Sequence, residues 1–209
     1  GARSTIARLV GAGEYHRRAA RRIFLWSYFE GVDEGERRMW LGGVGNDNFL
    51  ASPTDGGLFL AAFVAPVDRW EELRGDRTGG YEEGIARWPE LAEQLAGARR
   101  VGSVRMMSRW HGYFRESAGP GWALVGDAGH FKDPTPGQGI SDALRQAVAL
   151  APAIERGLGG AEPADEALRR WWAWRDRDAG EMYWFAQDMG ATDRAPIVLG
   201  ATQARFGAE

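Results

Sequence analysis

Residues 122–151 place the strongest limits on what this chain can fold into. They open with four apolar residues, 122–125, which predict a buried strand, and the apolar run stops at Gly126 and Asp127. A turn rich in glycine and proline follows, and an unbroken helical pattern starts near Ile140. A strand, an acidic turn, a glycine loop and a helix N-terminus in this order commonly hold a charged or polar cofactor. We therefore expect a cofactor site in this stretch.

Composition is typical of a soluble globular chain and excludes several classes of function. The 209 residues are 44% hydrophobic and 26% charged, enough for a core in one large or two small domains. The net charge of −3 argues against a dedicated nucleic-acid-binding protein. Cysteine is absent, which excludes disulfides and thiolate chemistry. With no apolar run near the ~20 residues of a membrane span and no signal peptide, we expect a cytoplasmic protein.

The first half of the chain has the periodicity of β-structure. A short helical turn capped by Ser4 opens it, and alternation with period two begins at Arg22. One face of that strand carries three aromatic side chains, and short turns separate it from later strands, which favours an antiparallel meander. The aromatic residues are Phe24, Trp26 and Tyr28. The further strand candidates are Arg37–Val44, Asn48–Ser52, Leu58–Val64 and Arg99–Arg109, with Trp110–Arg115 extending or pairing with the last.

Helical patterns occupy the middle and the end of the chain. The long helix Ile140–Gly157 has apolar residues at helical spacing, and Pro152 should kink or divide it. Pro163 starts a second, polar helix that carries four tryptophans. The apolar positions of the first helix are Leu144, Val148, Ala151 and Ile154, and the tryptophans are Trp171, Trp172, Trp174 and Trp184. The other expected helices are Asp68–Arg74, Gly80–Trp88 and Glu90–Leu95, and a last apolar piece is Pro196–Phe206.

Residues 126–139 follow the pattern G-D-A-x-H-x(3)-P-x(2)-G-Q-G at every fixed position. This pattern resembles the second flavin-binding motif of the FAD-dependent aromatic hydroxylases, the flavoprotein monooxygenases of the p-hydroxybenzoate hydroxylase fold. Agreement at this many positions is a far stronger signal than a lone glycine fingerprint. The resemblance implies an FAD site formed by seven residues. They are Gly126, Asp127, Pro134, Gly137, Gln138, Gly139 and Ile140.

The resemblance also implies a role for parts of this site. Asp127 accepts hydrogen bonds from the ribityl chain of FAD, and Pro134 lies at the flavin face where the substrate meets the cofactor. Gly137 and Gly139 let the backbone approach the flat ring. The helix N-terminus at Gly139 and Ile140 directs N–H groups at the N1/O2 edge, where charge stabilisation is worth about 3–4 kcal/mol per donor. No residue is assigned a catalytic role, because the oxygen chemistry belongs to the cofactor.

The resemblance covers the whole chain as the C-terminal part of such an enzyme. Residues 1–8 resemble the tail of the family's Asp-Gly motif, and the meander takes the place of the substrate domain. The implied fold class is α/β (mixed α+β), an antiparallel substrate-domain sheet with the returning strand and helices of an FAD domain. The expected parts are an FAD-domain tail (1–20), the substrate-domain sheet (21–115), the FAD-domain return (116–160) and C-terminal helices (161–209).

Two departures from the family pattern matter. The G-x-G-x-x-G phosphate loop and the aspartate of the Asp-Gly motif are not in these residues, so the pyrophosphate of FAD has no cradle here. We therefore interpret the chain as a fragment that does not bind FAD tightly or turn over alone. Gly129 stands where many relatives have alanine, a difference that we treat as conservative.

The leading hypothesis is an FAD-dependent monooxygenase that uses NAD(P)H and dioxygen on a small hydrophobic or aromatic molecule. A flavin-dependent reductase or halogenase of the same fold shares the motif and stays open. A flavin-less interaction module is the alternative outside enzymes. We expect no nucleic-acid partner and no metal site, and a homo-oligomer is possible.

Several residues allow a functional and a purely structural interpretation. His130 could act as a base or contact NAD(P)H, but we favour a histidine that orients the loop. Lys132, the chain's only lysine, and Asp133 are read as an exposed ion pair of little energetic value. The three aromatics of the first strand either line a substrate pocket or form core, and we favour core.

Two further groups of residues, four tryptophans and four arginines, also allow more than one interpretation. The four tryptophans of the last helix are expected to pack against the absent half or a neighbouring subunit, or to form an exposed stripe. Four arginines could steer phosphate or NAD(P)H, but we favour a solvated helix face. These arginines are Arg17, Arg18, Arg21 and Arg22.

Overall fold

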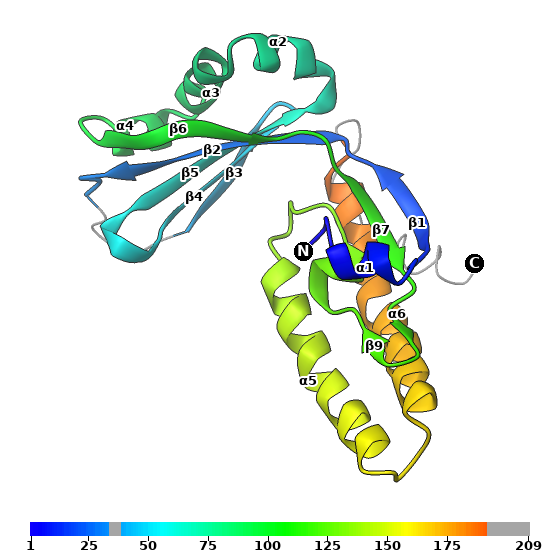
Figure 1. Ribbon diagram of the computed structural model, residues 1–209. Coiled ribbons are helices and arrows are strands. Elements are labelled where there is room, and N and C mark those ends of the chain that lie inside the picture. The colour runs from blue at the N-terminus through cyan, green and yellow to red at the C-terminus, as the bar shows by residue number, and fades with distance from the viewer. Residues whose placement is uncertain (34–38, 192–209) are drawn as a thin grey trace. The chain divides into compact units, whose positions relative to one another are not determined.

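The computed structural model describes residues 1–33 and 39–191. The chain forms two compact units, one made of Gly1–Ala19 with the chain from His111 onward, the other of Ala20–Trp110. Each unit combines antiparallel strands with helices (Figure 1). The predicted mixed α/β class is therefore confirmed, and each unit is described below by itself.

The unit Ala20–Trp110 is built on a five-stranded sheet in the order β3-β4-β5-β2-β6. All of its strand pairs are antiparallel, as expected for a meander joined by short turns. The strands are β2 (Arg22–Glu30), β3 (Trp40–Val44), β4 (Asp47–Pro53), β5 (Phe59–Pro66) and β6 (Arg99–Met107). The first residues of the predicted strand at 37–44 lie outside the described residues.

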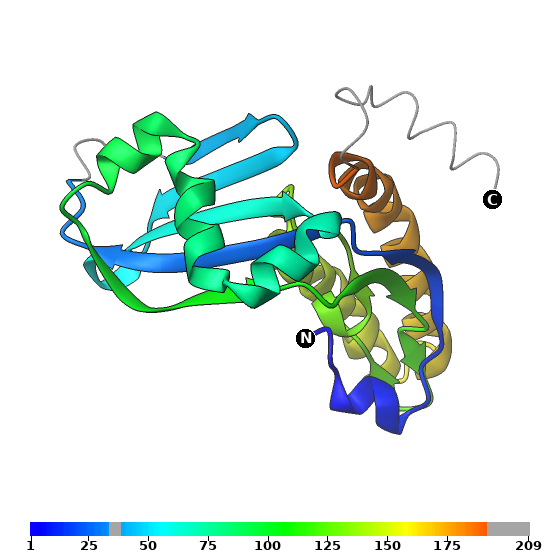
Figure 2. The ribbon, with the colours of Figure 1, turned by 90° about the horizontal axis from the view of Figure 1, so that it is seen from above.

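Three helices cover one face of this sheet (Figure 2). That face buries Ile23, Leu25 and Phe63 completely against side chains such as Leu73 and Tyr81. The covering helices are α2 (Trp70–Gly75), α3 (Arg77–Ala86) and α4 (Pro89–Gln94).

The aromatic face of β2 is the opposite one, so the interpretation of its aromatics as core is wrong. Phe24, Trp26 and Tyr28 are only partly buried and lie outside the core cluster of this unit. Alternation along a strand determines which residues share a face but not which face the helices cover. The helices pack against the aliphatic face, which carries Ile23 and Leu25.

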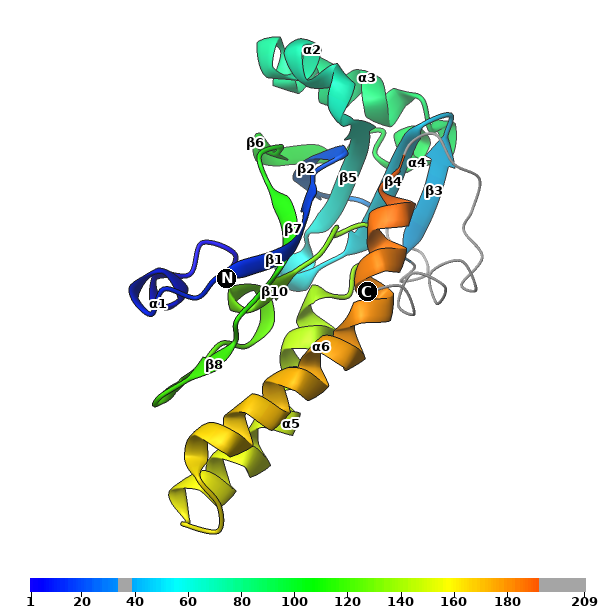
Figure 3. The same ribbon diagram turned by 90° about the vertical axis from the view of Figure 1, so that its right-hand side faces the viewer.

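The other unit contains a three-stranded antiparallel sheet in the order β1-β7-β10 and a two-stranded ribbon, β8-β9. Ser4 caps α1 through a hydrogen bond from the Ala7 N–H, as predicted. The strands are β1 (Glu14–Ala19), β7 (His111–Arg115), β8 (Ala118–Gly119), β9 (Trp122–Ala123) and β10 (His130–Phe131). The helices are α1 (Thr5–Leu9), α5 (Gly139–Leu158) and α6 (Ala164–Met189), and Figure 3 shows α5 and α6 side by side.

The tryptophans of α6 pack against other elements of this unit, and this burial corrects the prediction for Trp171 and Trp184. Trp171 and Trp184 are almost fully buried, and Trp172 and Trp174 are half-buried. The Trp171 indole donates to the backbone oxygen of Gln146 on α5, and the Trp172 indole donates to the Tyr15 hydroxyl on β1. Contacts with α5, the preceding helix, and with β1, far away in sequence, account for this burial.

Helix α5 differs from its predicted form in two ways. It runs as one helix through Pro152, whose ring lies on the exposed side. Its predicted apolar stripe is also exposed: 64% of Leu144 and 75% of Val148 are accessible. The face that α6 and the turn 126–128 bury is instead the one with Gln146 and Leu150. Helical spacing predicted the stripe correctly, but tertiary packing buries the opposite side.

The arginine run near residue 20 is not a helix face, in contrast to the favoured interpretation. Arg17 and Arg18 belong to β1, and Arg22 begins β2. The Arg18 guanidinium lies 4.5 Å above the Trp184 ring, a cation–π contact. Arg22 is buried and donates to the backbone oxygen of Asn46. Strand pairing, which the local pattern does not reveal, overrides helical propensity here. The predicted apolar piece Pro196–Phe206 lies outside the described residues.

Candidate functional site

The predicted cofactor stretch forms a connected set of turns on the β1-β7-β10 unit. The predicted strand at 122–125 is shorter than expected, because only Trp122 and Ala123 pair with β8. The Leu124 N–H bonds the Ser117 carbonyl, and the chain then enters a short 3-10 turn, η3 (Gly126–Ala128). Next come β10, an irregular loop and the long helix α5. The order of turn, loop and helix N-terminus matches the expectation.

Gly126 joins the acidic turn to α5 by close packing. Its φ of 58° favours glycine, and a Cβ there would lie 2.9 Å from the Cβ of Ala143. Its N–H donates to Oε1 of Gln146 at 2.9 Å, and both groups are buried. No motif in the sequence indicates this role for Gln146, a polar residue on α5. These two contacts hold the η3 turn at a fixed distance from α5.

Asp127 lies in the η3 turn, close to the start of α5. Its carboxylate makes no hydrogen bond within the part of the chain that the structure describes, and the residue is half-buried. A Cβ on Gly139 would lie 3.9 Å from Oδ1 of Asp127, an ordinary contact distance, so the two residues are neighbours. The structure thus brings Asp127 next to the first residue of α5. An unpaired carboxylate beside bare backbone can accept hydrogen bonds from sugar-like hydroxyls.

The loop between β10 and α5 is shaped by internal hydrogen bonds. Asp133 is buried and accepts bonds from both the N–H and the hydroxyl of Thr135. The Gly137 N–H bonds the Pro134 carbonyl at 2.9 Å, which closes a turn, and Gly137 has a φ of 67°. Pro134, the first residue of this turn, is half-buried, and Gly137, the last, is exposed.

Lys132 and Asp133 are not the exposed ion pair that the sequence predicted. Both residues are buried, and the Lys132 amine pairs with the carboxylate of Asp142 on α5. Burial lowers the pKa of Lys132, and the hydrogen bond to Asp142 opposes that shift. The prediction failed because Lys132 pairs with Asp142, ten residues later in the sequence, and this contact buries both side chains.

The N-terminus of α5 has no side-chain cap. Gln138 occupies the cap position without a capping hydrogen bond from its side chain, and the first internal bond is Asp142 N–H to Gln138 O. The amides of Gly139, Ile140 and Ser141 thus open the helix, and Gly139 and Ile140 are exposed. Unpaired N–H groups and the helix dipole favour a negatively charged or carbonyl-bearing partner. The structure therefore brings the η3 turn with Asp127 next to the start of α5 with Gly139.

Tyr113 and Arg115 on β7 connect this motif to the start of the chain. The Tyr113 hydroxyl lies 2.6 Å from the Asp127 carbonyl and 3.1 Å from that of Ala2. Arg115 donates to the Ala128 carbonyl at 2.9 Å. Burial raises the pKa of Tyr113 to about 12, so it stays a neutral donor. Sequence reasoning missed both residues, because β-pairing alone aligns them with the motif.

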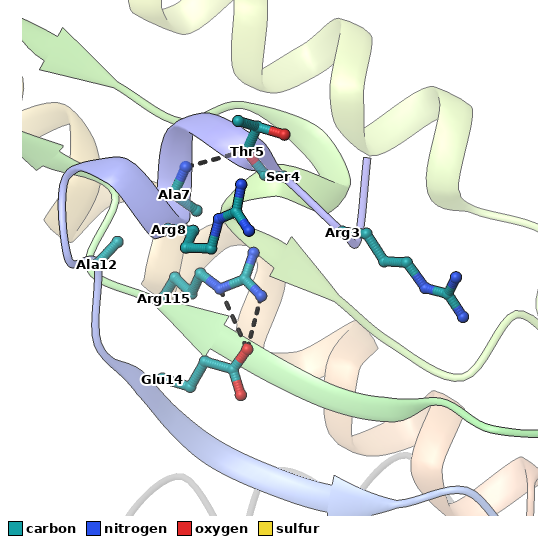
Figure 4. Close-up of a pocket in the computed structure, with 8 residues that line it drawn as sticks. All are labelled: Arg3, Ser4, Thr5, Ala7, Arg8, Ala12, Glu14 and Arg115. Atoms are coloured by element: carbon teal, nitrogen blue, oxygen red, sulfur yellow. Dashed lines mark hydrogen bonds and ion pairs between the residues drawn. The ribbon is translucent and has the colours of Figure 1, made fainter.

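A cavity of about 430 Å³ lies beside α1, next to this junction (Figure 4). Three of its lining side chains are arginines and one is acidic. The acidic group, Glu14, is held by Arg115 at 2.6 Å and by His111 at 2.8 Å. Burial raises its pKa, but these hydrogen bonds outweigh burial and lower it. The lining residues are Arg3, Ser4, Thr5, Ala7, Arg8, Ala12, Glu14 and Arg115.

The cavity is cationic because Arg115 already satisfies Glu14. Arg3 and Arg8 make no ion pair within the described residues. Both come from the segment whose sequence resembles the tail of an Asp-Gly motif. Their guanidinium groups suit phosphate oxygens.

His130 is a core residue, so burial argues against its acting as a base or touching NAD(P)H. It is 3% exposed and lies 4.6 Å from the Phe114 ring. Burial, and then the nearby charge of Arg175, lower its pKa well below the usual 6.5. Neither ring nitrogen makes a hydrogen bond in the described part of the chain.

With this geometry established, known structures provide a comparison. The halogenase CndH, described as a myxobacterial chondrochloren halogenase and a variant of FAD-dependent halogenases, matches 100% of this chain and 51% of its own length, with a TM-score of 0.78 and 22% identity. The flavin-dependent halogenase CmlS matches 100% of this chain and 41% of its own, with a TM-score of 0.72 and 22% identity. The chain has the fold of these flavoproteins.

A monooxygenase shares the same architecture. PqsL, a probable FAD-dependent monooxygenase from Pseudomonas aeruginosa, matches 98% of this chain and 57% of its own length, with a TM-score of 0.63 and 19% identity. The chain therefore spans about half the length of these neighbours. At such identities the match establishes the fold alone.

One curated protein is related in sequence. The 1H-pyrrole-2-carbonyl-[peptidyl-carrier protein] brominase of Pseudoalteromonas luteoviolacea (strain 2ta16) is 31% identical over 72 residues, which are 34% of this chain and 18% of the brominase. The chain matches none of the protein-family models with which it was compared.

The described residues contain neither a membrane-spanning helix nor a metal-binding cluster. None of the described helices combines the length and the apolar content of a membrane span. Within the same residues, no three His, Asp or Glu side chains gather as metal ligands.

Proposed function

We propose that this chain is part of an FAD-dependent oxidoreductase, a monooxygenase that uses NAD(P)H and dioxygen to hydroxylate a small hydrophobic or aromatic molecule. The observation that carries the proposal is the unpaired carboxylate of Asp127 beside Gly139, at the uncapped N-terminus of α5. FAD, when bound, supplies the redox and oxygen chemistry. The residues of this chain bind and orient it.

Each part of the site has a defined task in this proposal. Asp127 accepts hydrogen bonds from the ribityl hydroxyls, which fixes the ring relative to η3. The amides of Gly139 and Ile140 donate to the N1/O2 edge and stabilise negative charge there. Gly137, Gly139 and Pro134 present a surface without protruding polar side chains to the flat ring. Gln138 is the last residue of the loop before α5, and Gly126 allows the η3 turn to pack closely on that helix.

The cationic cavity beside α1 fits the phosphate groups of a dinucleotide. Arg3 and Arg8 face it without an ion pair among the described residues, and they come from the segment with Asp-Gly resemblance. Tyr113 and Arg115 connect this segment to the Asp127 turn. We infer that FAD or NAD(P)H phosphates bind on this side.

The remaining part of the flavin site comes from a dinucleotide-binding unit outside these residues, on the same or another chain. The structural neighbours are about twice as long as this chain. Helix α5 exposes Ile140, Leu144 and Val148, an apolar stripe that would be costly to leave in water. A dinucleotide-binding unit that packs on this stripe would complete the flavin domain.

The aromatic face of the five-stranded sheet supports a hydrophobic substrate. Phe24, Trp26 and Tyr28 lie on the face that α2–α4 leave open, and they are half-buried. Such faces bind planar or apolar molecules through ring contacts. We propose that they line the substrate pocket.

A flavin-dependent halogenase is the second candidate, and the sequence match to a brominase favours it. The complete enzyme, supplied with substrate, dioxygen and NAD(P)H, distinguishes the two. A product that gains a hydroxyl group, without dependence on halide, supports the monooxygenase. A product that gains bromine or chlorine only when halide is present supports the halogenase.

Riboflavin binding tests the flavin site in this chain, because riboflavin contains the ring and the ribityl chain but no phosphate. We expect the 209-residue chain to quench riboflavin fluorescence. The Asp127→Asn substitution should weaken binding about tenfold, the size of one charge-assisted hydrogen bond. Asp165→Asn, in the first turn of α6, is the matched control and should leave binding unchanged.

Absence of riboflavin binding by the chain, together with a colourless complete protein, would contradict the flavin proposal. That result would instead favour an interaction module that keeps the sheet and helices without flavin.

A further inference from the structure

Lys132 is the only lysine of the chain and is one of its most buried charged groups. Only 4% of its side chain is exposed, and its amine pairs with the Asp142 carboxylate, which is exposed to the same extent. Buried ion pairs cost desolvation energy and are weak evidence of a stabilising role. A solvated lysine would be the cheaper choice in the loop, so its burial needs another explanation.

The pair belongs to a balanced network of charges that reaches from the loop to α6. Arg145 lies 3.2 Å from Asp142 and 2.8 Å from Asp178 on α6. Two cations and two carboxylates alternate, so the network carries no net charge. Its effect on a nearby ligand is therefore one of geometry rather than of electrostatic potential.

The position of the pair in the sequence shows what it holds. Lys132 and Asp142 flank residues 133–141, which contain the whole loop and the first turn of α5. Inside this segment, Thr135 bonds the Asp133 carboxylate and the Gly137 N–H bonds the Pro134 carbonyl, and both contacts are local. A contact between the two ends restricts the whole loop, and closing a longer loop removes more chain entropy than closing a local turn.

We propose that the Lys132–Asp142 pair is a clasp that positions the loop 133–141, and that Lys132 is a positioning residue of the proposed flavin site. Arg145 extends the clasp to Asp178, so the loop is tied to α6 as well as to α5. The proposal rests on the proposed function for its ligand. The conformational part depends only on the described residues.

Positioning and stability can be separated by substitution. Removing Asp142 leaves Lys132 as a buried charge without this partner and destabilises the fold, whereas Lys132→Met leaves Asp142 paired with Arg145. Replacing both residues by apolar ones is often neutral. The variants are Lys132→Met, Asp142→Leu and the double substitution. The urea midpoint should fall most in Asp142→Leu, less in Lys132→Met, and recover in the double variant.

Hydrogen–deuterium exchange of the 209-residue chain without ligand measures the loop directly. We expect the amides of Thr135, Gly137 and residue 142 to exchange at least about tenfold faster in the double variant than in the wild type, although its urea midpoint has recovered. Loop amides that exchange at the wild-type rate in a stable double variant would overturn the proposal. If the double variant stays destabilised, exchange is compared at equal unfolding free energy, with the same criterion.

A control pair of substitutions exists at the other end of α5. Arg156 and Glu162 form an ion pair at 2.6 Å, far along the helix from the loop. The double variant Arg156→Met with Glu162→Leu should leave exchange at Thr135 and Gly137 unchanged. Accelerated loop exchange in this control would show a general effect of α5 stability and would contradict the clasp.

Riboflavin binding provides a second measurement. The Lys132→Met/Asp142→Leu variant should bind riboflavin at least about tenfold more weakly than the wild type, since the loop no longer holds its shape. Equal affinity would show that the clasp does not serve the ligand. If neither protein binds riboflavin, the flavin proposal fails, while the exchange experiment still decides whether the clasp holds the loop.

Discussion

At the scale of single residues, glycines determine how closely the motif packs. Gly129 stands where the family resemblance allows alanine, and we treated that difference as conservative. The structure corrects this interpretation. A Cβ on Gly129 would lie 2.4 Å from the Ser117 hydroxyl and 2.7 Å from the backbone oxygen of Leu124. The backbone oxygen cannot move aside as the end of a flexible side chain can.

The Gly129→Ala substitution should therefore destabilise the protein by about 1–3 kcal/mol, the range for overpacking in a filled interior. Urea denaturation measures the change. Gly13→Ala is the matched control in the same unit, because a Cβ there would meet Glu116 at an ordinary 3.5 Å. Equal stability of the two variants would contradict the close packing around Gly129.

At the scale of secondary-structure elements, α5 combines a site at one end with a local defect farther along. Its N-terminus supplies the amides of Gly139 and Ile140, and Gln146 in its second turn anchors the motif turn. Pro152 cannot donate the hydrogen bond that a helix needs at this position. The helix nevertheless continues, because packing on α6 through Leu150 and Ala153 holds both sides of the proline.

Pro152→Ala should stabilise the protein by about 1–3 kcal/mol, since alanine restores the donor and has the higher helix propensity. Thermal unfolding followed by circular dichroism provides the measurement. Pro163→Ala is the control, because Pro163 caps α6, where an N–H is not required. We expect its effect to stay within about 0.5 kcal/mol. A destabilising Pro152→Ala substitution would contradict this account of α5.

At the scale of the whole molecule, buried titratable groups make stability depend on pH. His130 is neutral in the folded state because burial, and then Arg175, Lys132 and Arg145, lower its pKa well below 6.5. In the unfolded chain it titrates near 6.5. The unfolded state therefore binds a proton below this pH and the folded state does not. The contribution of His130 to the free energy of unfolding should be fully present above pH 6.5 and should decrease as the pH falls below it.

The free energy of unfolding, measured with urea at about pH 7.5 and about pH 5.5, tests this dependence. The slope from one such histidine approaches about 1.4 kcal/mol per pH unit. His130→Phe should reduce it, whereas His111→Gln, at a half-exposed position, should retain it. An unchanged slope in His130→Phe would show that other groups cause the acid sensitivity.

Local patterns in the sequence determined much of this protein. Residues 126–139 predicted the turn, the loop and the helix N-terminus, because these depend on backbone conformations that glycine, proline and aspartate favour. Period-two alternation and short turns predicted the antiparallel sheet of Ala20–Trp110, because successive side chains of a strand point to opposite faces and short turns join antiparallel strands. The resemblance to FAD-dependent hydroxylases agreed with the fold of the structural neighbours. The four-part division of the chain and the ligand contacts stay predictions.

Only the tertiary structure decided which surfaces meet. It buried Trp171 inside its own unit, exposed Leu144 on α5 and turned the Phe24 face of β2 away from the helices. It also converted Lys132 from an expected surface charge into the partner of Asp142. Periodicity encodes which residues share a face, whereas burial depends on contacts with segments distant in sequence. No local pattern contains those contacts.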